Sequence, residues 1–306
     1  MLERAIDAYV AAVDAEGLAA LGVHVVHGDA EAEHRWAADE RTDLYSVSKG
    51  IAALAIGIGV DEGLLGLETT VGETLPDLVD GQDASAITVR QLLTMTSGID
   101  FAWFASEPAP WPDLAAEMLG CEVTGVPGET FRYSDASTTV ALRVLRAVTG
   151  EDVVAWLTPR LFEPLGIGTP EWQRCRLGHP IGGSGLQLCT SELGRIARLL
   201  RDEGRFGARQ LVSAAWVRAM RAADGAWVAT GAGEGSDFRH YGMAVWQGPG
   251  ECWRLDGHLG QYVVVHEPSC TAVSITPREE EHDHRLAELV PQVLLPQLVG
   301  PPARES

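Results

Sequence analysis

Lysine is almost absent from this sequence. Of the 23 lysine and arginine residues in the chain of 306 residues, all but one are arginines, and the exception is Lys49. Arginine stays protonated in proteins, whereas a desolvated lysine can lose its proton. Because arginine supplies positive charge everywhere else, the single lysine indicates a place where an amine that titrates is needed.

Long apolar runs and an excess of positive charge are also missing. The longest apolar run, Ile51 to Val60, is too short to cross a bilayer. Met1 to Val10 is predicted as a short amphipathic helix, without the basic stretch, apolar segment and cleavage site of a signal peptide. The net charge of −20 repels phosphate backbones and anionic headgroups. We therefore expect no nucleic-acid partner, no membrane association and a cytoplasmic location.

Cysteine is scarce and shows no paired spacing. The five cysteines are Cys121, Cys175, Cys189, Cys252 and Cys270. An odd number of scattered cysteines without a Cys-x-x-Cys pair favours reduced thiols in a cytoplasm and disfavours a structural zinc site. His282 and His284 lie in a charged run without further ligands nearby. We expect no metal and no cofactor.

Strand patterns occur near both ends of the chain. They cover Leu21 to His27, Glu31 to Ala37, Gly242 to Gln247, Cys252 to Leu255, Tyr262 to His266 and Ala272 to Thr276. The residues between them have mostly helical spacing. This order predicts an α/β lobe built from residues 1–60 and 214–306, with residues 61–213 as a mostly helical lobe inserted between them.

Ser46 stands three residues before Lys49, at the predicted start of a buried helix over Gly50 to Val60. Residues three apart share one face of a helix, so the hydroxyl and the amine can meet and the amine can take the serine proton. The amide groups at a helix start also favour developing negative charge. The alternative is a surface lysine, but the apolar neighbours bury this segment, where an unpaired lysine would be costly.

Two further motifs follow along the chain. Tyr133-Ser134-Asp135 comes after a turn at Val126 to Glu129, and His258-Leu259-Gly260 lies between two predicted strands. Together with Ser46-x-x-Lys49 they resemble the three motifs of serine β-lactamases, penicillin-binding proteins and related esterases. Four longer segments resemble the class C β-lactamase and esterase branch of that family: Val89 to Gly98, Pro127 to Ser134, Leu161 to Gly166 and Gly182 to Thr190.

The resemblance implies both a fold and a chemistry. The fold is an antiparallel sheet flanked by helices beside a helical lobe, with the active site between the two. Ser46 is the expected acylated nucleophile, and Lys49 and Tyr133 share general-base and general-acid work. The backbone amides of Ser46 and Gln261 are expected to form the oxyanion hole.

The substrate-binding residues implied by the resemblance are Asp135, His258 and Gly260, and the loop residue Trp103 is a candidate for lining an apolar acyl pocket together with Phe104 and Trp111. Tyr133 and Trp103 have an alternative reading as ordinary core aromatics.

Two positions depart from the β-lactamase pattern. Asp135 stands where asparagine is usual, and an ionised aspartate offers no donor to a substrate carbonyl. The alternative is that Asp135 points away and caps the helix that follows. His258 stands where lysine is common, which makes a permanent positive charge for a substrate carboxylate less certain.

These departures favour a cytoplasmic esterase or amidase that forms an acyl-enzyme on Ser46 and acts on small esters or amides. A β-lactamase, a D-alanyl carboxypeptidase or a D-aminopeptidase is the second hypothesis, and a non-catalytic binding protein of the same fold is the third. The expected partner is a small ester, amide or β-lactam, and the oligomeric state is left open.

Overall fold

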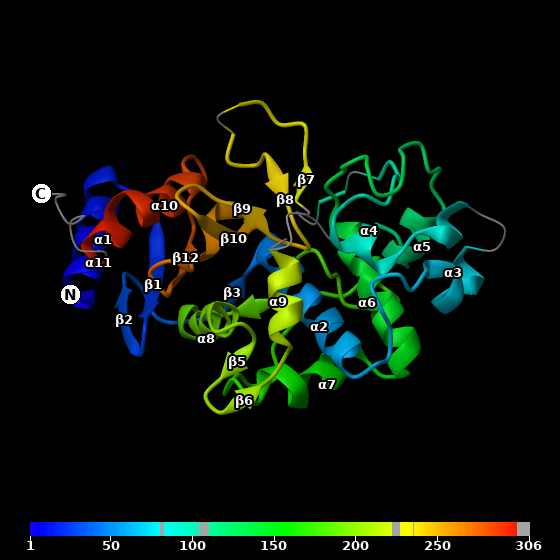
Figure 1. The fold of residues 1–306 in the computed structure, drawn as a ribbon, viewed down its shortest axis with the longest axis horizontal. Helices are drawn as coiled ribbons and strands as arrows, with labels where there is room; N and C mark the ends of the chain where they lie inside the picture. Colours follow the sequence, from blue (N-terminus) through cyan, green and yellow to red (C-terminus); the bar gives the residue numbers. More distant parts are fainter. Residues whose placement is uncertain (80–82, 102, 105–109, 222–226, 235, 299–306) are drawn as a thin grey trace, which may run out of the picture.

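The centre of the molecule is an antiparallel sheet of eight strands (Figure 1). A computed structural model describes residues 1–79, 83–101, 103–104, 110–221, 227–234 and 236–298. The strands are β1 Ala20–His27, β2 Ala30–Arg35, β7 Val228–Ala229, β8 His240–Tyr241, β9 Trp246–Gln247, β10 Cys252–Gly257, β11 Gln261–His266 and β12 Thr271–Pro277. Their order across the sheet is β2-β1-β12-β11-β10-β9-β8-β7, so β1 and β12 join strands from the two ends of the chain. The predicted antiparallel sheet flanked by helices is confirmed.

Helix α2, Ser48–Asp61, runs through the interior between the sheet and the helices of the middle of the chain. It is buried on all sides from Ser48 to Gly59, as its uniformly apolar and small residues predict. Glycines allow the close approach of its neighbours: a Cβ on Gly50 would lie 2.4 Å from Leu255 of β10, and one on Gly57 would lie 2.3 Å from Trp216. This burial fixes the helix that follows Ser46.

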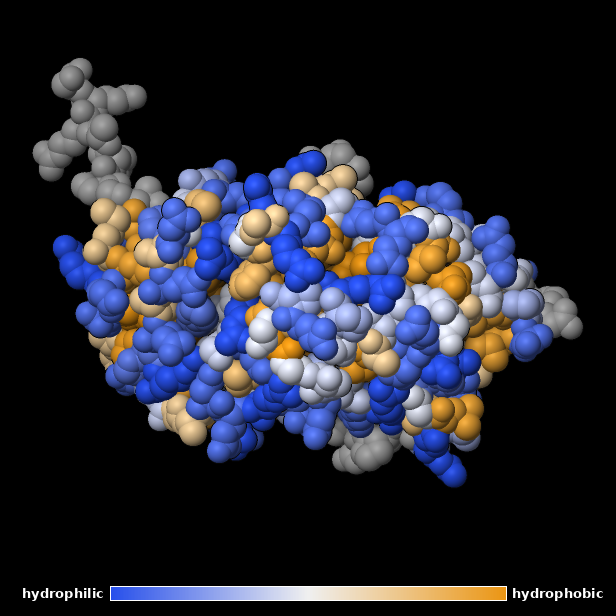
Figure 2. Space-filling view, turned by 90° about the horizontal axis from the view of Figure 1, so that it is seen from below, coloured by the Kyte–Doolittle hydropathy of each residue, from blue (hydrophilic) through white to orange (hydrophobic). Residues whose placement is uncertain are grey.

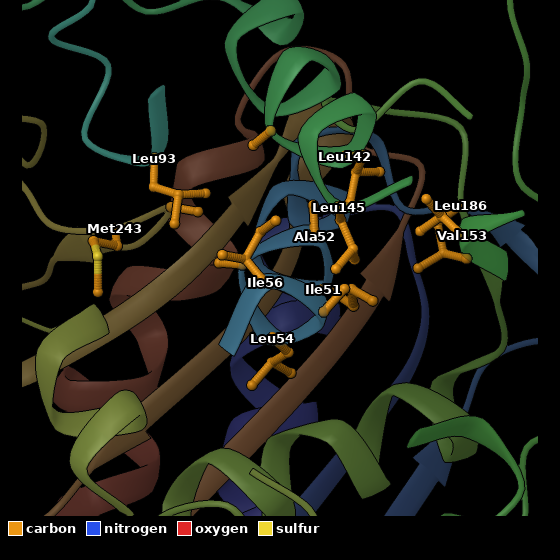
Figure 3. Packing of buried hydrophobic residues seen from close by; sticks show 14 of the residues in the cluster. Ile51, Ala52, Leu54, Ile56, Leu93, Leu142, Leu145, Val153, Leu186 and Met243 are labelled. Carbon is orange, nitrogen blue, oxygen red and sulfur yellow. The ribbon is translucent and has the colours of Figure 1, made fainter. Parts of the chain in front are cut away.

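The middle of the chain forms a helical region on one side of α2. Its helices are α3 Val71–Thr74, α4 Val89–Leu93, α5 Leu114–Leu119, α6 Asp135–Thr149 and α7 Val153–Leu157. The longest, α6, packs against both α2 and α5. Figure 3 shows Ile51, Leu54 and Ile56 of α2 in the same apolar cluster as Leu142 and Leu145 of α6.

Helices from both ends of the chain cover the outer face of the sheet. They are α1 Leu2–Glu16, α10 Asp283–Leu289 and α11 Leu295–Leu298, which lie together at the left of Figure 1. The buried hydroxyl of Tyr9 donates a hydrogen bond to the carbonyl oxygen of Leu286 over 3.0 Å. A second apolar core fills the space between these helices and the sheet.

Helix α8, Thr190–Arg201, packs against β1, β11 and β12 even though it lies within the range 61–213. Helix α8 approaches β1 so closely that a Cβ on Gly194 would lie 1.9 Å from Nδ1 of the buried His24. Helix α9, Ala214–Met220, follows, and its predicted N-cap is confirmed because Ser213 Oγ accepts from the Trp216 amide. The division of the chain into two lobes stays a prediction.

Short strands pair outside the main sheet. They are β3 Thr42–Asp43 with β4 Gln187–Leu188, and β5 Arg205–Phe206 with β6 Arg209–Gln210. Strand β3 of the first pair ends shortly before Ser46 in the chain. This pair therefore joins the approach to the predicted nucleophile to a segment about 140 residues away in the sequence.

One predicted strand is wrong. The stretch from Gly242 to Gln247 is not continuous, because a turn at 242–245 separates β8 from β9. The Gly242 amide donates to the Val245 carbonyl over 2.8 Å, and Ala244 has a positive φ of 60°. The apolar residues Met243, Ala244 and Val245 make the turn resemble the strands on either side of it.

Hydrophilic residues predominate on the face of the molecule in Figure 2, and apolar residues appear there in small groups. Within the described ranges, we find no helix that is both long enough and apolar enough to span a bilayer.

Candidate active site

Ser46 lies in a single 3₁₀ turn, Tyr45–Val47, that leads directly into α2. Both β10 and β11 pack against this turn. Gly257, the last residue of β10, makes the approach possible, since a Cβ there would lie 2.5 Å from the carbonyl oxygen of Leu44. Ser46 therefore sits where the end of the sheet meets the start of the central helix, and it is half-buried.

Lys49 is buried, with a relative exposure of 1%, one helical turn after Ser46. Its ammonium group has three N–H bonds and three acceptors. Nζ lies 2.7 Å from Ser46 Oγ, 2.5 Å from Asp135 Oδ1 and 2.9 Å from the carbonyl oxygen of Gly183. The structure thus brings the hydroxyl and the amine together, and it presents Lys49 as a saturated donor.

Two neighbours control the protonation of Lys49. Burial alone would lower the pKa of Lys49, but Tyr133 and Asp135 oppose this effect and raise the pKa above its ordinary value. Burial also raises the pKa of Tyr133, against the effect of the Lys49 charge. Tyr133 is therefore neutral near pH 7, so that the charge of Asp135 is what holds Lys49 protonated there.

Asp135 begins α6 and points toward Lys49, with its side chain 4% exposed. The cap of this helix is Ser134, whose Oγ accepts from the Ala136 amide over 3.2 Å. The alternative in which Asp135 points away as a cap is therefore wrong. A buried carboxylate and the amine of Lys49 form an ion pair beside Ser46.

Tyr133 lies beside Ser46 and Lys49, and its interactions with both side chains oppose the rise that burial causes in the pKa of its hydroxyl. The Lys49 Nζ is 4.7 Å from the centre of its ring. The residue is held in a cluster of aromatic rings: the ring centres of Tyr241 and Trp246 lie 5.8 Å and 5.6 Å from that of Tyr133. This packing holds the ring of Tyr133 beside Lys49.

The third predicted motif lies beside the nucleophile turn. His258 is exposed, and its ring meets the ring of Tyr45 edge-on, with 5.3 Å between the centres. Gly260 has a positive φ of 85° at the turn between β10 and β11. The next residue, Gln261, is buried and starts β11, where it pairs with Gly257. Its backbone therefore faces the same end of the sheet as Ser46.

Trp103 contributes to the site in an unforeseen way. Its carbonyl oxygen accepts from the Asp135 amide over 3.1 Å. Its ring is half-buried and faces Trp111, 6.1 Å away between centres. The aromatic residue that stacks on Tyr133 is instead Phe104, at 6.1 Å and an angle of 23°, and it is 52% exposed.

Sequence reasoning missed two contributors. One is the carbonyl oxygen of Gly183, which accepts from Lys49. The other is Asp43, which accepts from the amides of Tyr45 and Gly185. The position of Asp43 three residues before Ser46 was visible in the sequence, but its distant partner was not. Across the described part of the chain, no group of three or more His, Cys, Asp or Glu side chains is arranged to hold a metal ion.

Comparison with known proteins gives relatives of several activities. The 6-aminohexanoate-dimer hydrolase of Paenarthrobacter ureafaciens is 26% identical over 205 residues, which cover 61% of this chain and 52% of the relative. The lovastatin esterase of Penicillium rubens is 27% identical over 194 residues, which cover 52% of this chain and 47% of the relative. The matched part thus spans about half the length of these curated relatives.

Structural comparison shows the same fold. A class C β-lactamase superposes with a TM-score of 0.75 at 14% identity, and the alignment covers 98% of this chain and 96% of that protein. At this identity the likeness shows the fold alone. The family model described as Beta-lactamase matches residues 2–285, nearly the whole sequence. The serine, lysine and tyrosine that meet between sheet and helices thus occur in a chain that belongs to the β-lactamase family.

Proposed function

We propose that the protein is a serine hydrolase that cleaves small neutral esters or amides through an acyl-enzyme on Ser46. The observation that carries the proposal is the 2.7 Å contact between Ser46 Oγ and Lys49 Nζ, completed by the nearby Tyr133 hydroxyl. A nucleophile within hydrogen-bonding distance of a buried amine is the arrangement that activates serine in the absence of histidine.

Acylation requires that the serine proton leave as its oxygen attacks. In the resting state Lys49 donates all three of its N–H bonds, so the reactive form is the one in which Lys49 has released one of these protons to solvent. We propose that the neutral amine of Lys49 then takes the serine proton, with the Tyr133 hydroxyl sharing the transfer. Ser46 Oγ then bonds to the substrate carbonyl carbon, and the backbone amides of Ser46 and Gln261 stabilise the resulting oxyanion.

Collapse of this intermediate breaks the bond to the leaving alcohol or amine, which takes the proton from the Tyr133–Lys49 pair. Water then attacks the acyl-enzyme with the same residues working in reverse, which releases the acid and restores Ser46. Every proton removed from a nucleophile is returned to a leaving group.

The ion pair of Lys49 with Asp135 supports a preference for neutral substrates. Both side chains are at most 4% exposed, so the pair adds no net positive charge to attract a substrate carboxylate. His258, which stands where lysine is common, does not supply a permanent positive charge either. Penicillins and D-alanyl peptides carry a carboxylate, so β-lactamase or peptidase activity is the second candidate rather than the first.

The lining of the site supports an apolar substrate. Phe104 stacks on Tyr133, and Phe238 meets Trp246 edge-on with 4.9 Å between ring centres. Phe104 is 52% and Phe238 38% exposed. Two accessible rings that pack on the Tyr133 cluster provide an apolar surface for an acyl or alkoxy group.

We also propose a cytoplasmic location. The five cysteines are all unpaired thiols, and three of them are buried. Thiols in this state are typical of a reducing compartment.

Covalent labelling tests the proposed nucleophile. A fluorophosphonate probe, read by intact mass and peptide mapping, should modify Ser46 in the wild type and leave Ser46→Ala unmodified. Ser184→Ala is the matched control, because Ser184 is a buried serine on the loop beside Lys49. This variant should leave labelling unchanged. An adduct on any residue other than Ser46, or no adduct under conditions where the protein is folded, would overturn the proposal.

A further inference from the structure

One carboxylate oxygen links the two segments that meet at the site. Oδ1 of Asp43 accepts from the Tyr45 amide over 2.7 Å and from the Gly185 amide over 3.0 Å. Tyr45 immediately precedes Ser46, whereas Gly185 lies 142 residues after Asp43 in the chain. The same oxygen atom therefore contacts both the turn of the nucleophile and a distant loop.

The turn of the nucleophile needs such support. Tyr45 has φ 46°, in the left-handed region that side chains other than glycine rarely adopt. This conformation sets the direction in which the chain enters the 3₁₀ turn, and so where Ser46 Oγ points. The bond from the Tyr45 amide to Asp43 closes a short local ring around that residue.

The distant loop orients the amine. The carbonyl oxygen of Gly183, two residues before Gly185, accepts from Lys49 Nζ over 2.9 Å. Gly183 is packed so tightly that a Cβ there would lie 2.4 Å from the Cα of Asp135. A shift of this loop would therefore move the Gly183 carbonyl oxygen and Asp135 together. These two groups accept hydrogen bonds from Lys49 and so fix its distance from Ser46.

The strand pair β3–β4 brings these parts together. Asp43 pairs with Gln187, and the Leu44 amide donates to the Leu186 carbonyl over 2.9 Å. The Leu186 amide in turn donates to Ser48 Oγ over 3.3 Å. The ladder fixes the register of the two segments. The Asp43 carboxylate accepts its two hydrogen bonds at the point where the ladder ends and the turn begins.

We propose that Asp43 is a positioning residue, whose Oδ1 holds the turn carrying Ser46 and the loop carrying Gly183 at the separation that brings Ser46 Oγ onto Lys49. The inference rests on the proposed hydrolase function of that site. It assigns to Asp43 a role in setting the reactive geometry, without contact with the substrate.

The role depends on the place of an acceptor oxygen rather than on charge. Burial raises the pKa of Asp43, while the amides of Tyr45 and Gly185 oppose this rise and Asp135 adds to it. Either ionisation state keeps a lone pair for the two amides, and so does the amide oxygen of asparagine. Glutamate keeps the charge but moves the oxygen by one methylene, which distinguishes geometry from charge.

Three variants and one control test the proposal. Asp43→Ala removes the acceptor, Asp43→Asn keeps it, and Asp43→Glu displaces it. Asp152→Ala is the matched control, because Asp152 Oδ1 also accepts from two backbone amides, those of Val154 and Ala155, at the start of α7. For each, kcat and KM with a p-nitrophenyl ester, the rate of fluorophosphonate labelling and the unfolding midpoint are measured.

A misplacement of about 1 Å typically costs about 100-fold in rate. We expect Asp43→Ala to lower kcat and the labelling rate by about that factor, with KM within about threefold of the wild type. Asp43→Asn should stay within about threefold in kcat, and Asp43→Glu should be as slow as the alanine variant. Asp152→Ala should lose thermal stability without losing kcat.

Two results would overturn the role of Asp43: a folded alanine variant with nearly full kcat, or an asparagine variant as slow as alanine. If Asp43→Ala does not fold, the asparagine and glutamate pair decides, since a fast glutamate or a slow asparagine variant contradicts the proposal. Failure of the wild type to label at Ser46 would instead reject the hydrolase function itself, so the two failures are distinguishable.

Discussion

Replacement of Asp135 by asparagine is the perturbation that the ion pair makes most informative. Asp135→Asn keeps the shape of the side chain and an oxygen that can accept from Lys49, but removes the charge 2.5 Å from its Nζ. That charge favours the protonated amine. Without it, Lys49 releases its proton at lower pH, and the base form needed for acylation accumulates earlier as the pH rises.

The size of the effect follows from the separation. At an effective dielectric constant of about 20, two unit charges about 4 Å apart interact by about 4 kcal/mol, and Lys49 Nζ and Asp135 Oδ1, at 2.5 Å, are closer than this. A change of about 1.36 kcal/mol corresponds to one pKa unit. We expect the rising limb of kcat/KM to move to lower pH by about 1 to 3 pH units. A substrate carboxylate about 4 Å from Asp135 would be repelled on the same scale, so acylation by β-lactams relative to neutral esters should rise by about 10-fold at least, with about 1000-fold as the upper bound.

The assay compares nitrocefin and p-nitrophenyl butyrate over a range of pH for both proteins. Asp152→Asn is the control, because it removes one negative charge from a surface ion pair with Arg174. Breaking one side of a buried ion pair can cost about 3 to 5 kcal/mol in stability, so the unfolding free energy is measured as well. An unchanged substrate ratio together with an unchanged pH profile in a folded variant would refute the reasoning.

Three further changes have defined outcomes. Lys49→Arg keeps the charge but cannot supply a neutral amine, so kcat for p-nitrophenyl esters should fall by about 100-fold or more in a folded protein. Near-normal turnover would mean that Lys49 acts only as a fixed charge. Phe104→Ala should raise KM for aryl or long-chain esters by about 10-fold while leaving acetyl esters little changed, because the ring that stacks on Tyr133 is lost; an equal effect on all esters would argue against a substrate contact. Gly194→Ala should destabilise the protein by about 1 to 3 kcal/mol in urea titrations, since the new methyl group would overlap His24, whereas the usual helix preference of alanine would produce the opposite sign.

Residues close in the sequence were the ones that sequence reasoning placed well. Ser46 and Lys49 are three apart on one helical segment, so a local rule brings the hydroxyl and the amine together. The strands β11 and β12 are rich in β-branched residues, and the predicted ranges match these two strands and β10 closely. Tyr133 came from the resemblance to a known family rather than from any pattern of spacing.

Contacts between distant segments could not be read from the sequence. Nothing in the composition of the loop from 182 to 186 indicates that Gly183 accepts from Lys49 or that Gly185 donates to Asp43. The choice between Trp103 and Phe104 at the Tyr133 ring depends on the path of a loop, and both residues have the same apolar character. The direction of Asp135 was open for the same reason, because a residue at a helix start can either cap it or turn inward.

The pairing of β1 with β12 has a consequence for how the protein is made. It joins residues 20–27 to residues 271–277, so the first strand to leave the ribosome waits for almost the last one before the centre of the sheet can close. Helices of the middle region have local contacts and can form earlier during synthesis. The turn of Ser46 packs against β10 and β11, which also emerge late. The nascent chain should therefore carry its reactive serine and lysine for most of translation without reactivity toward a fluorophosphonate, and labelling should begin only once the C-terminal strands are in place.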